Sequence, residues 1–289
     1  MFGATGFLGR SLVAALTEAG GAVTVVGRPG STSEAGSIPF TLGQGEPRPR
    51  PGPHDAAVFL AQSSAYADGL AAAPDVFAVN VVGLAEALEI ARDAGVSRFL
   101  NASSGSVYPL ADHPHSERSP ADANGIYARS KQFAETLLGE WSDEFSTLSL
   151  RFFALYGPGQ VAKMVPGLAD RIRRGDPVVL DRRDETDVDP GGFRTSPCFV
   201  GDATAAVVAL LEQDRCGVLN VAGAEALNIR EMATEIGQVI GREPHFEVSS
   251  RFRTGDLVAD VSELRRLTGL PSVPFLQGLR ETFGGDSCG

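Results

Sequence analysis

The sequence predicts an α/β fold: a doubly wound parallel sheet with a smaller C-terminal α/β lobe. Over the first half of the chain, β-branched runs alternate with alanine- and leucine-rich stretches of helical periodicity, as expected of parallel strands joined by helical crossovers. A glycine-rich loop near the start runs into the first of these helices. A hydroxyl-rich segment, 101–108, leaves a later strand at its carboxyl end, where open α/β sheets bind ligands.

The alternation gives each element its place along the chain. The expected strands span 23–26, 56–60, 99–102 and 147–152. The expected helices span 7–19, 74–94, 127–141, 202–212, 229–240 and 261–268. The proline-rich stretch 44–53 is expected to be a surface connection. We expect an NADP(H)-binding domain at 1–156 and a mainly substrate-binding lobe at 157–289, with segment 196–223 returning to the first domain.

The glycine-rich loop has the spacing GxxGxxG, with glycines at Gly3, Gly6 and Gly9, and Phe7 and Leu8 open the helix that follows. Backbone N–H groups of such a loop, together with the N-terminus of the helix, can receive a pyrophosphate. A β-rich run follows the helix at the distance expected of a βαβ unit. We therefore predict that these five residues bind a dinucleotide.

The strand before this loop is very short. A strand of about five or six residues normally precedes such a loop, and here only Met1 and Phe2 precede Gly3. That strand lies centrally in a doubly wound sheet, so its loss would leave backbone groups on both neighbours unpaired. We expect the natural product to begin upstream of Met1.

Arg28 indicates which nucleotide is bound. An NAD-specific site usually has an acid at the end of the second strand, and this chain has Gly27 and Arg28 there. A guanidinium can pair with the 2′-phosphate of NADP. NADP(H) is therefore favoured, and NAD(H) remains an alternative.

Tyr127 and Lys131 stand one helical turn apart in the segment YARSK, so their side chains can face one cleft. Ser104 lies upstream in the hydroxyl-rich segment that leaves a strand. A phenol, an ammonium and a hydroxyl together suit proton transfer to a carbonyl that receives a hydride. We take Ser104, Tyr127 and Lys131 as the catalytic residues.

The chain resembles the extended short-chain dehydrogenases/reductases, the NAD-dependent epimerase/dehydratase family, which includes UDP-galactose 4-epimerase and many NDP-sugar reductases. The matching segments run in order along almost the whole chain: GATGFLG at Gly3, VFLAQ at Val58, NVVGL at Asn80, SSGSVY at Ser103, YARSK at Tyr127, LRFFALYGPGQ at Leu150, FVGDATAA at Phe199, LNVAG at Leu219 and VADVSELRRLTG at Val258. The resemblance implies a Rossmann-type fold and a nucleotide-sugar substrate.

The resemblance also implies roles for further residues. Ser104 would polarise the substrate carbonyl, with Ser106 beside it, and Lys131 would anchor the ribose hydroxyls of the cofactor. Leu60, Ala61 and Asn80 would lie along the cofactor. Phe153 would lie near its nicotinamide. Family members commonly pair through the helices expected around 76–94 and 127–141, which implies a homodimer.

The chain departs from the family pattern in three places, and these departures bear on which reaction and which substrate contacts the resemblance implies. Gly105 and Ser106 follow Ser104 where dehydratases of the family have an acidic pair, so elimination of water is disfavoured. Ala154 replaces the asparagine that contacts the substrate diphosphate in the epimerase pattern. Arg194 is a candidate for gripping that diphosphate, although it stands one residue out of register.

Composition excludes other classes of function. The formal net charge is −11 and the pI is about 4.9, which argues against nucleic acid as a partner. No stretch approaches 18 consecutive apolar residues, so we expect no membrane partner and a cytoplasmic protein. The cysteines and histidines show no metal-ligand spacing, and we expect no metal site.

The sequence thus favours an NADP(H)-dependent oxidoreductase that reduces the keto group of a nucleotide-activated deoxysugar or a similar polar carbonyl. One alternative is an NDP-sugar epimerase using NAD(P), which returns the hydride to the same substrate. Another is a non-catalytic regulator that senses NADP, but such a protein has no need of Ser104, Tyr127 and Lys131.

Overall fold

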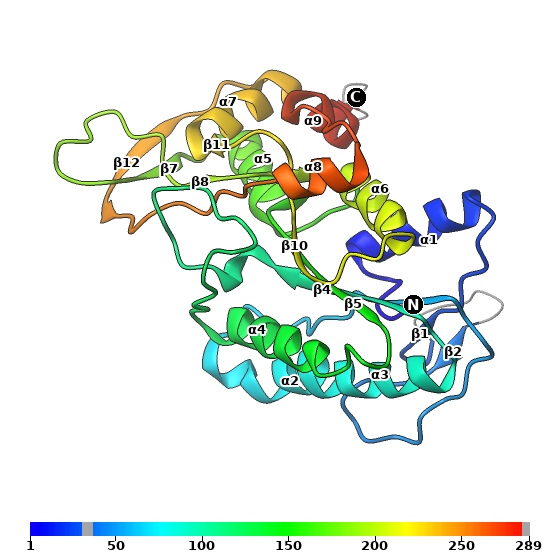
Figure 1. Ribbon diagram of the computed structural model, residues 1–289. Helices are drawn as coiled ribbons and strands as arrows, with labels where there is room; N and C mark the ends of the chain where they lie inside the picture. Colours follow the sequence, from blue (N-terminus) through cyan, green and yellow to red (C-terminus); the bar gives the residue numbers. More distant parts are fainter. Residues whose placement is uncertain (31–36, 285–289) are drawn as a thin grey trace. The chain divides into compact units, whose positions relative to one another are not determined.

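The computed structural model describes residues 1–30 and 37–284, and the chain divides into two compact units (Figure 1). The first unit comprises Met1–Val107, Pro120–Arg151 and Thr204–Leu219. The second unit comprises Tyr108–Ser119, Phe152–Ala203 and Asn220–Gly289. The sequence analysis predicts that residues 1–156 bind the cofactor and that residues 157–289 mainly bind the substrate. This assignment of ligands to the two parts stays a prediction.

The first unit contains the central sheet. Its strands are β1 (Val26–Gly27), β2 (Ile38–Pro39), β3 (Ala56–Phe59), β4 (Arg98–Ser104), β5 (Ser146–Phe152) and β10 (Gly217–Val221). Strands β10, β5, β4 and β3 are neighbours in that order, and β1 pairs with β2 in parallel. Phe2 makes parallel bridges to both Val26 and Phe59, so it lies between β1 and β3 in the central position predicted for the first strand.

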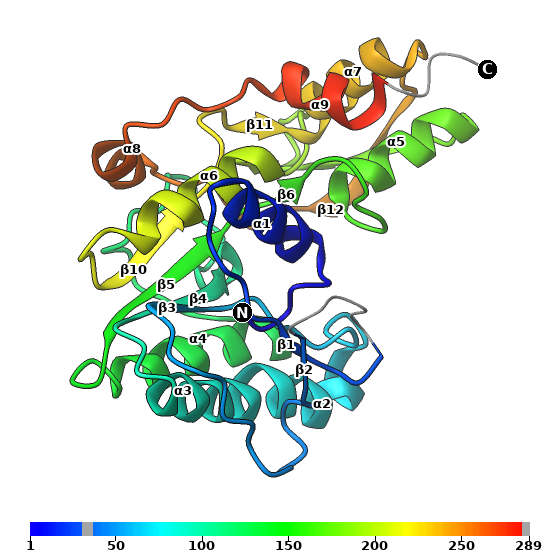
Figure 2. The same cartoon turned by 90° about the vertical axis from the view of Figure 1, so that its right-hand side faces the viewer.

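This strand order, in which Phe2 stands for the first strand, is that of a doubly wound sheet. The helices of the first unit cover both of its faces: α2 (Ala73–Phe77), α3 (Gly83–Asp93) and α4 (Ile126–Gly139) lie on one face, and α1 (Phe7–Glu18) and α6 (Val200–Leu211) lie on the other (Figures 1 and 2). The predicted α/β, Rossmann-type fold is therefore confirmed.

The core of this unit follows from the periodicity of α3. Leu84, Leu88 and Ala91 recur on one face of the helix and are buried, where they join Phe59 and Phe99 from the sheet in one apolar cluster. Burying a leucine or phenylalanine side chain contributes about 1.5–3 kcal/mol. These contacts hold α3 against the sheet.

The predicted helix 74–94 is not uniform. A 3-10 turn, η1 (Gly69–Ala72), precedes it, and a π-helical turn, η2 (Ala78–Val82), separates α2 from α3 within it. Among the described residues, the run Gly69–Asp93 is the one helix long and apolar enough to cross a membrane by length and composition, with 25 residues and a mean hydropathy of 1.4. One such helix is weak evidence, because a helix that packs on a sheet passes the same test.

The described residues of the second unit form three strand pairs and four helices. Strand β6 (Leu155–Tyr156) pairs with β9 (Cys198–Phe199), β7 (Val178–Arg182) with β12 (Phe246–Phe252), and β8 (Arg194–Thr195) with β11 (Leu227–Asn228). The helices are α5 (Met164–Arg174), α7 (Ile229–Ile240), α8 (Ser262–Thr268) and α9 (Phe275–Phe283). Helix α7 begins at a capping box formed by Asn228 and Glu231, which explains its sharp start.

Candidate cofactor and catalytic site

Two of the three glycines of the loop, Gly3 and Gly9, are required by close backbone approach. Gly3 has φ +82°, and a Cβ atom there would lie 2.6 Å from the backbone nitrogen of Ala61. A Cβ atom on Gly9 would lie 2.3 Å from the carbonyl oxygen of Gly3. The first glycine thus lets the turn pass the end of β3, and the third lets α1 pack against the turn.

The start of α1 fits a phosphate group. Gly6 is the N-cap residue, and within the described part of the chain no side chain caps it. The N–H groups of the first helical turn have no partner inside the helix, and the helix dipole favours negative charge there. Phe7, Leu8 and Gly9 therefore present backbone donors to an anion, as the sequence predicted for a dinucleotide pyrophosphate.

Leu60 and Ala61 lie directly beside this loop. The N–H of Leu60 donates a hydrogen bond to the carbonyl oxygen of Phe2 at 2.9 Å, and the backbone of Ala61 contacts Gly3 closely. The structure therefore brings together the glycine loop and the two residues predicted to lie along the cofactor. Their contact with a cofactor stays a prediction.

Arg28 directly follows β1 and is exposed. Phe2 bridges β1 in parallel and immediately precedes the glycine loop, so Arg28 and Gly3 lie at the same edge of the sheet. This is the place where the second strand of a doubly wound sheet meets the adenosine ribose. The preference for NADP over NAD stays a prediction.

Ser104, Tyr127 and Lys131 come together in the first unit. Ser104 ends β4, and its hydroxyl forms a hydrogen bond with the Tyr127 phenol. The Oγ atoms of Ser104 and Ser106 are 2.8 Å apart. Lys131 Nζ lies 5.9 Å from the centroid of the Tyr127 ring and donates to the carbonyl oxygen of Ala102 at 2.8 Å.

Burial controls the protonation of both titratable groups. Burial raises the pKa of Tyr127, and the hydrogen bond from Ser104 opposes that rise. Burial lowers the pKa of Lys131 to about 8, against the opposing charge of Glu135. At neutral pH the tyrosine of the protein alone is therefore neutral, and the lysine is mostly an ammonium.

Asn80 is linked by hydrogen bonds to the start of α4. Its side chain is 1% exposed, and its Oδ1 accepts from the N–H of Ser63 at 3.1 Å. Its Nδ2 donates to Ser130 Oγ at 2.9 Å, and Ser130 Oγ donates to the carbonyl oxygen of Tyr127 at 2.7 Å. Asn80 thus ties the loop after β3 to the turn that carries Tyr127, and its predicted contact with the cofactor stays a prediction.

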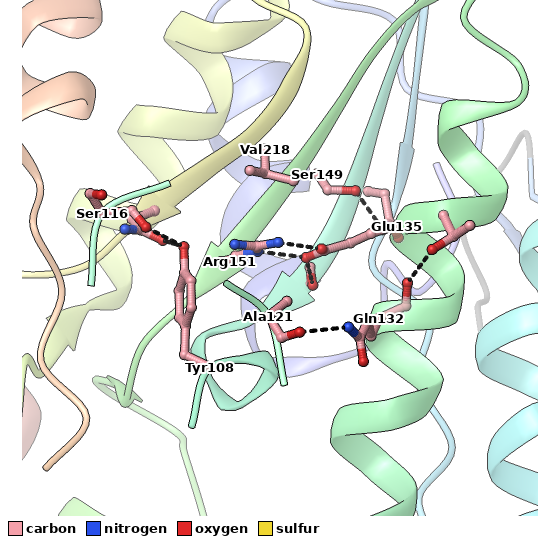
Figure 3. Close-up of polar contacts among 12 residues, drawn as sticks. Tyr108, Ser116, Ala121, Gln132, Glu135, Ser149, Arg151 and Val218 are labelled. Carbon is pink, nitrogen blue, oxygen red and sulfur yellow. Dashed lines mark hydrogen bonds and ion pairs between the residues drawn. The ribbon is translucent and has the colours of Figure 1, made fainter. Parts of the chain in front are cut away.

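Two residues of this site were missed by the sequence analysis. The ring of Tyr66 lies 5.2 Å from that of Tyr127, and no spacing in the sequence indicates this contact. Glu135 follows Lys131 by one helical turn, and its carboxylate faces Arg151 of β5 (Figure 3). The interval between Lys131 and Glu135 was a signal that could have pointed to Glu135.

The remaining predicted residues belong to the second unit. Phe153 is 1% exposed, and its ring lies 6.2 Å from that of Tyr108. Tyr108 donates to the carbonyl oxygen of Ser116 at 3.1 Å (Figure 3) and to Asn220 Oδ1 at 2.9 Å. The predicted role of Phe153 at the nicotinamide stays a prediction.

Arg194 is tied to the protein itself. Its Nε donates to the carbonyl oxygen of Ala226 at 3.1 Å, and its N–H donates to Asp256 Oδ1 at 2.9 Å. Asp256 also pairs with Arg183 and Arg253, and Arg183 pairs in addition with Asp112. The sequence analysis missed this cluster, and the predicted role of Arg194 in binding substrate stays a prediction.

Metal-ligand geometry was also sought in residues 1–30 and 37–284. Within these ranges no three His, Cys, Asp or Glu side chains gather as a metal site. Cys198 and Cys216 are free thiols, and Cys288 lies outside the described residues.

Known proteins are similar in sequence to about two thirds of this chain. UDP-glucuronic acid decarboxylase 6 of Arabidopsis thaliana is 26% identical over 217 residues, 69% of this chain and 60% of that protein. The dTDP-4-dehydro-6-deoxy-D-allose reductase of a Streptomyces species is 26% identical over 211 residues, 68% of this chain and 62% of the reductase. The chain therefore spans about 60% of the length of these curated relatives.

Among solved structures, MoeE5 in complex with UDP-glucuronic acid and NAD superimposes with a TM-score of 0.80 and 25% sequence identity, covering 98% of this chain and 96% of MoeE5. Residues 1–222 match the family model described as the NAD dependent epimerase/dehydratase family. This span includes the glycine loop, Ser104, Tyr127 and Lys131. The chain therefore belongs to the NAD dependent epimerase/dehydratase family.

Proposed function

We propose that this protein is an NADP(H)-dependent oxidoreductase that reduces the keto group of a nucleotide-activated deoxysugar by hydride transfer. The observation that carries the proposal is the hydrogen bond between Ser104 and the phenol of Tyr127, with the ammonium of Lys131 one helical turn further along α4. A hydroxyl, a phenol and an ammonium in this arrangement can polarise a carbonyl and deliver a proton to it.

The protonation state of Tyr127 suits reduction. Burial raises the pKa of its phenol, so the side chain holds its proton at neutral pH and can act as an acid. Oxidation of an alcohol requires the opposite state, a phenolate that accepts a proton.

Each residue of the site has a separate task in the reaction. A reduced nicotinamide cofactor held by the glycine loop, Gly3 to Gly9, would supply the hydride for the carbonyl carbon. Tyr127 Oη gives its proton to the carbonyl oxygen as negative charge develops there, and the hydroxyl of Ser104 donates a hydrogen bond to the same oxygen. The ammonium of Lys131 stabilises the phenolate that remains, and a proton from solvent restores Tyr127.

The substrate class is supported by the relatives. The Streptomyces relative acts, by its name, on a dTDP-linked 4-dehydro-6-deoxy sugar, and MoeE5 was solved with UDP-glucuronic acid. For the cofactor, Arg28 at the end of β1 supports NADP(H), because a guanidinium pairs with the 2′-phosphate that NAD lacks.

A direct assay tests the reaction. Purified protein is offered NADPH or NADH with a panel of dTDP- and UDP-4-keto sugars, and the loss of absorbance of the reduced nicotinamide is followed. We expect oxidation of NADPH with at least one sugar, and a loss of about 10²- to 10⁴-fold in Tyr127→Phe. Interconversion of sugar epimers with no net oxidation would instead favour an epimerase, and full activity in Tyr127→Phe would exclude this mechanism.

We further propose that the protein is a homodimer formed through α2, α3 and α4. This face presents apolar side chains: Phe133 is 55% exposed and Val82 is 49% exposed, and the rings of Phe77 and Phe133 lie 5.8 Å apart. Exposed aromatic side chains on one face are typical of a protein interface.

A further inference from the structure

Glu135 lies one helical turn beyond Lys131 on α4, and donors from two strands hold its carboxylate. Ser103 Oγ of β4 donates to Glu135 Oε1 at 2.5 Å. Arg151 of β5 donates from Nε to Oε1 at 2.8 Å and from Nη2 to Oε2 at 2.6 Å (Figure 3). The side chains of Arg151 and Glu135 are 6% and 9% exposed. A bidentate, buried pair of this kind keeps the carboxylate ionised and fixed in direction.

Lys131 needs such a neighbour because it is buried. Its side chain is 2% exposed, and its ammonium donates to a neutral partner, the carbonyl oxygen of Ala102. Burial favours the neutral amine, and the negative charge of Glu135 opposes that effect. Without Glu135, less would keep the proton on Lys131 at neutral pH.

Other groups from the elements around Lys131 offer little opposing charge. Strand β4 contributes Ser103 and Ser104, and η2 contributes Asn80, all of them neutral. On its own helix, Tyr127 is neutral because burial raises its pKa. Asp75 of α2 is exposed, and its carboxylate accepts a hydrogen bond from Ser63 Oγ. Arg151 of β5 is charged, but its positive charge opposes the ammonium.

We propose that Glu135 is a positioning residue: held by Arg151 and Ser103, it keeps the ammonium of Lys131 charged and in place beside Tyr127. The inference rests on the proposed function, in which Lys131 acts together with Tyr127. Glu135 touches neither the carbonyl nor the reacting atoms in this role, because it acts through Lys131.

The composition of the chain makes the test unusually direct, because Lys131 and Lys163 are its two lysines. Protein labelled with [ε-13C]lysine gives two signals whose chemical shifts report the charge of each amine as pH is changed. The Lys163→Arg variant assigns them, and Lys163 then serves as an internal reference. In the wild-type protein we expect Lys131 to titrate near its lowered pKa of about 8.

Two substitutions on α4 separate the charge of Glu135 from a general change in the helix. Glu135→Gln removes the negative charge and keeps the shape of the side chain, so the pKa of Lys131 should fall by about one unit, a tenfold change in its protonation equilibrium. Glu140→Gln, at the exposed end of the same helix, should leave Lys131 unchanged.

Two results would overturn the proposal. One is a Lys131 titration in Glu135→Gln that is the same as in the wild-type protein. The other is a fall in the pKa of Lys131 in Glu140→Gln that equals the fall in Glu135→Gln. Because these measurements use the protein without substrate, they succeed or fail separately from the sugar-reduction assay.

Discussion

The side-chain amide of Asn80 donates to Ser130 Oγ at 2.9 Å and thereby joins η2 to the turn of α4 that presents Tyr127. We predict that Asn80→Ala costs about 1–3 kcal/mol of stability, because it leaves the buried N–H of Ser63 and the hydroxyl of Ser130 with fewer partners. It should also lower kcat more than it raises KM, since it loosens the phenol and not the binding of substrate. Chemical denaturation and steady-state kinetics measure the two effects.

The matched control for Asn80 is a double-mutant cycle with Ser130→Ala. If the tie acts as described, the two substitutions together should cost less than the sum of their separate effects. Strict additivity would show that Asn80 and Ser130 stabilise α4 independently.

Arg28 should determine the preference for NADPH. In Arg28→Ala we expect the KM for NADPH to rise by about ten- to a hundredfold, because a hydrogen bond to a charged group contributes about 1.5–3 kcal/mol, and the KM for NADH to change little. Arg50→Ala, in the exposed proline-rich connection, should affect neither. Equal use of NADH and NADPH by the wild-type protein would remove this role of Arg28.

Ala154 has φ +32°, a left-handed conformation in which a Cβ atom costs about 1–2 kcal/mol. We predict that Ala154→Gly stabilises the protein by about 1 kcal/mol or slightly less, after allowing for the greater freedom of glycine in the unfolded chain. Ala14→Gly, at an exposed position inside α1, should do the opposite. The free energy of unfolding of both variants decides the matter, and a destabilised Ala154→Gly would show that the strain is relieved in some other way.

His115 should make the protein sensitive to acid. Burial lowers its pKa in the folded protein, whereas in the unfolded chain it titrates near about 6.5. Its contribution to stability is therefore complete above about pH 6.5 and is lost as pH falls through the lower folded pKa. His115→Phe preserves an aromatic ring against Tyr108, on which His115 stacks with the ring centroids 4.6 Å apart. The melting temperature of this variant should fall less between pH 8 and pH 5 than that of the wild type.

The control for His115 is His245→Gln, which removes an exposed histidine. This variant should keep the acid sensitivity of the wild type. Identical pH profiles for His115→Phe and the wild type would assign the acid sensitivity to other groups.

Phe133 tests the proposed dimer. A charged side chain at this exposed position of α4 cannot be buried against a second copy without a large desolvation cost, so Phe133→Glu should convert the dimer to a monomer in sedimentation at micromolar concentration. Phe252→Glu, at another half-exposed phenylalanine on β12, should leave the dimer intact. A wild-type protein that sediments as a monomer would contradict the proposal.

Elements with a local signal were predicted well from the sequence. Helix α7 spans Ile229–Ile240, the predicted range. Its helical apolar pattern lies within the segment, and its capping residue, Asn228, directly precedes it. The glycine loop was recognised for the same reason, because its glycine spacing reflects only a tight backbone turn and the start of the helix that follows it. Ser104, Tyr127 and Lys131, which the structure brings together, also lie within two short segments, and their catalytic role stays a prediction.

Elements that depend on distant partners were missed. Strands β7 and β12 pair in parallel from Val178 and Phe246 onward, and much of β12 is exposed, so the strand structure of each depends on a partner far along the chain. The π-helical turn η2 interrupts a stretch whose composition predicts an unbroken helix, and the bonds of Asn80 to Ser63 and Ser130 come from elements far along the chain. The contact between Glu135 and Arg151 likewise requires α4 to lie across β5.

The first two residues connect two parts of the sheet through their backbone. Phe2 N–H donates to Val58 and the carbonyl oxygen of Phe2 accepts from Leu60, and on the other side the carbonyl oxygen of Met1 accepts from the N–H of Val26, all at 2.9 Å. Arg28 follows β1, and the glycine loop follows Phe2. A dinucleotide that contacts both would hold the β1–β2 edge against β3, so amide hydrogen exchange in β1 should slow when the cofactor binds, at a distance from Ser104, Tyr127 and Lys131.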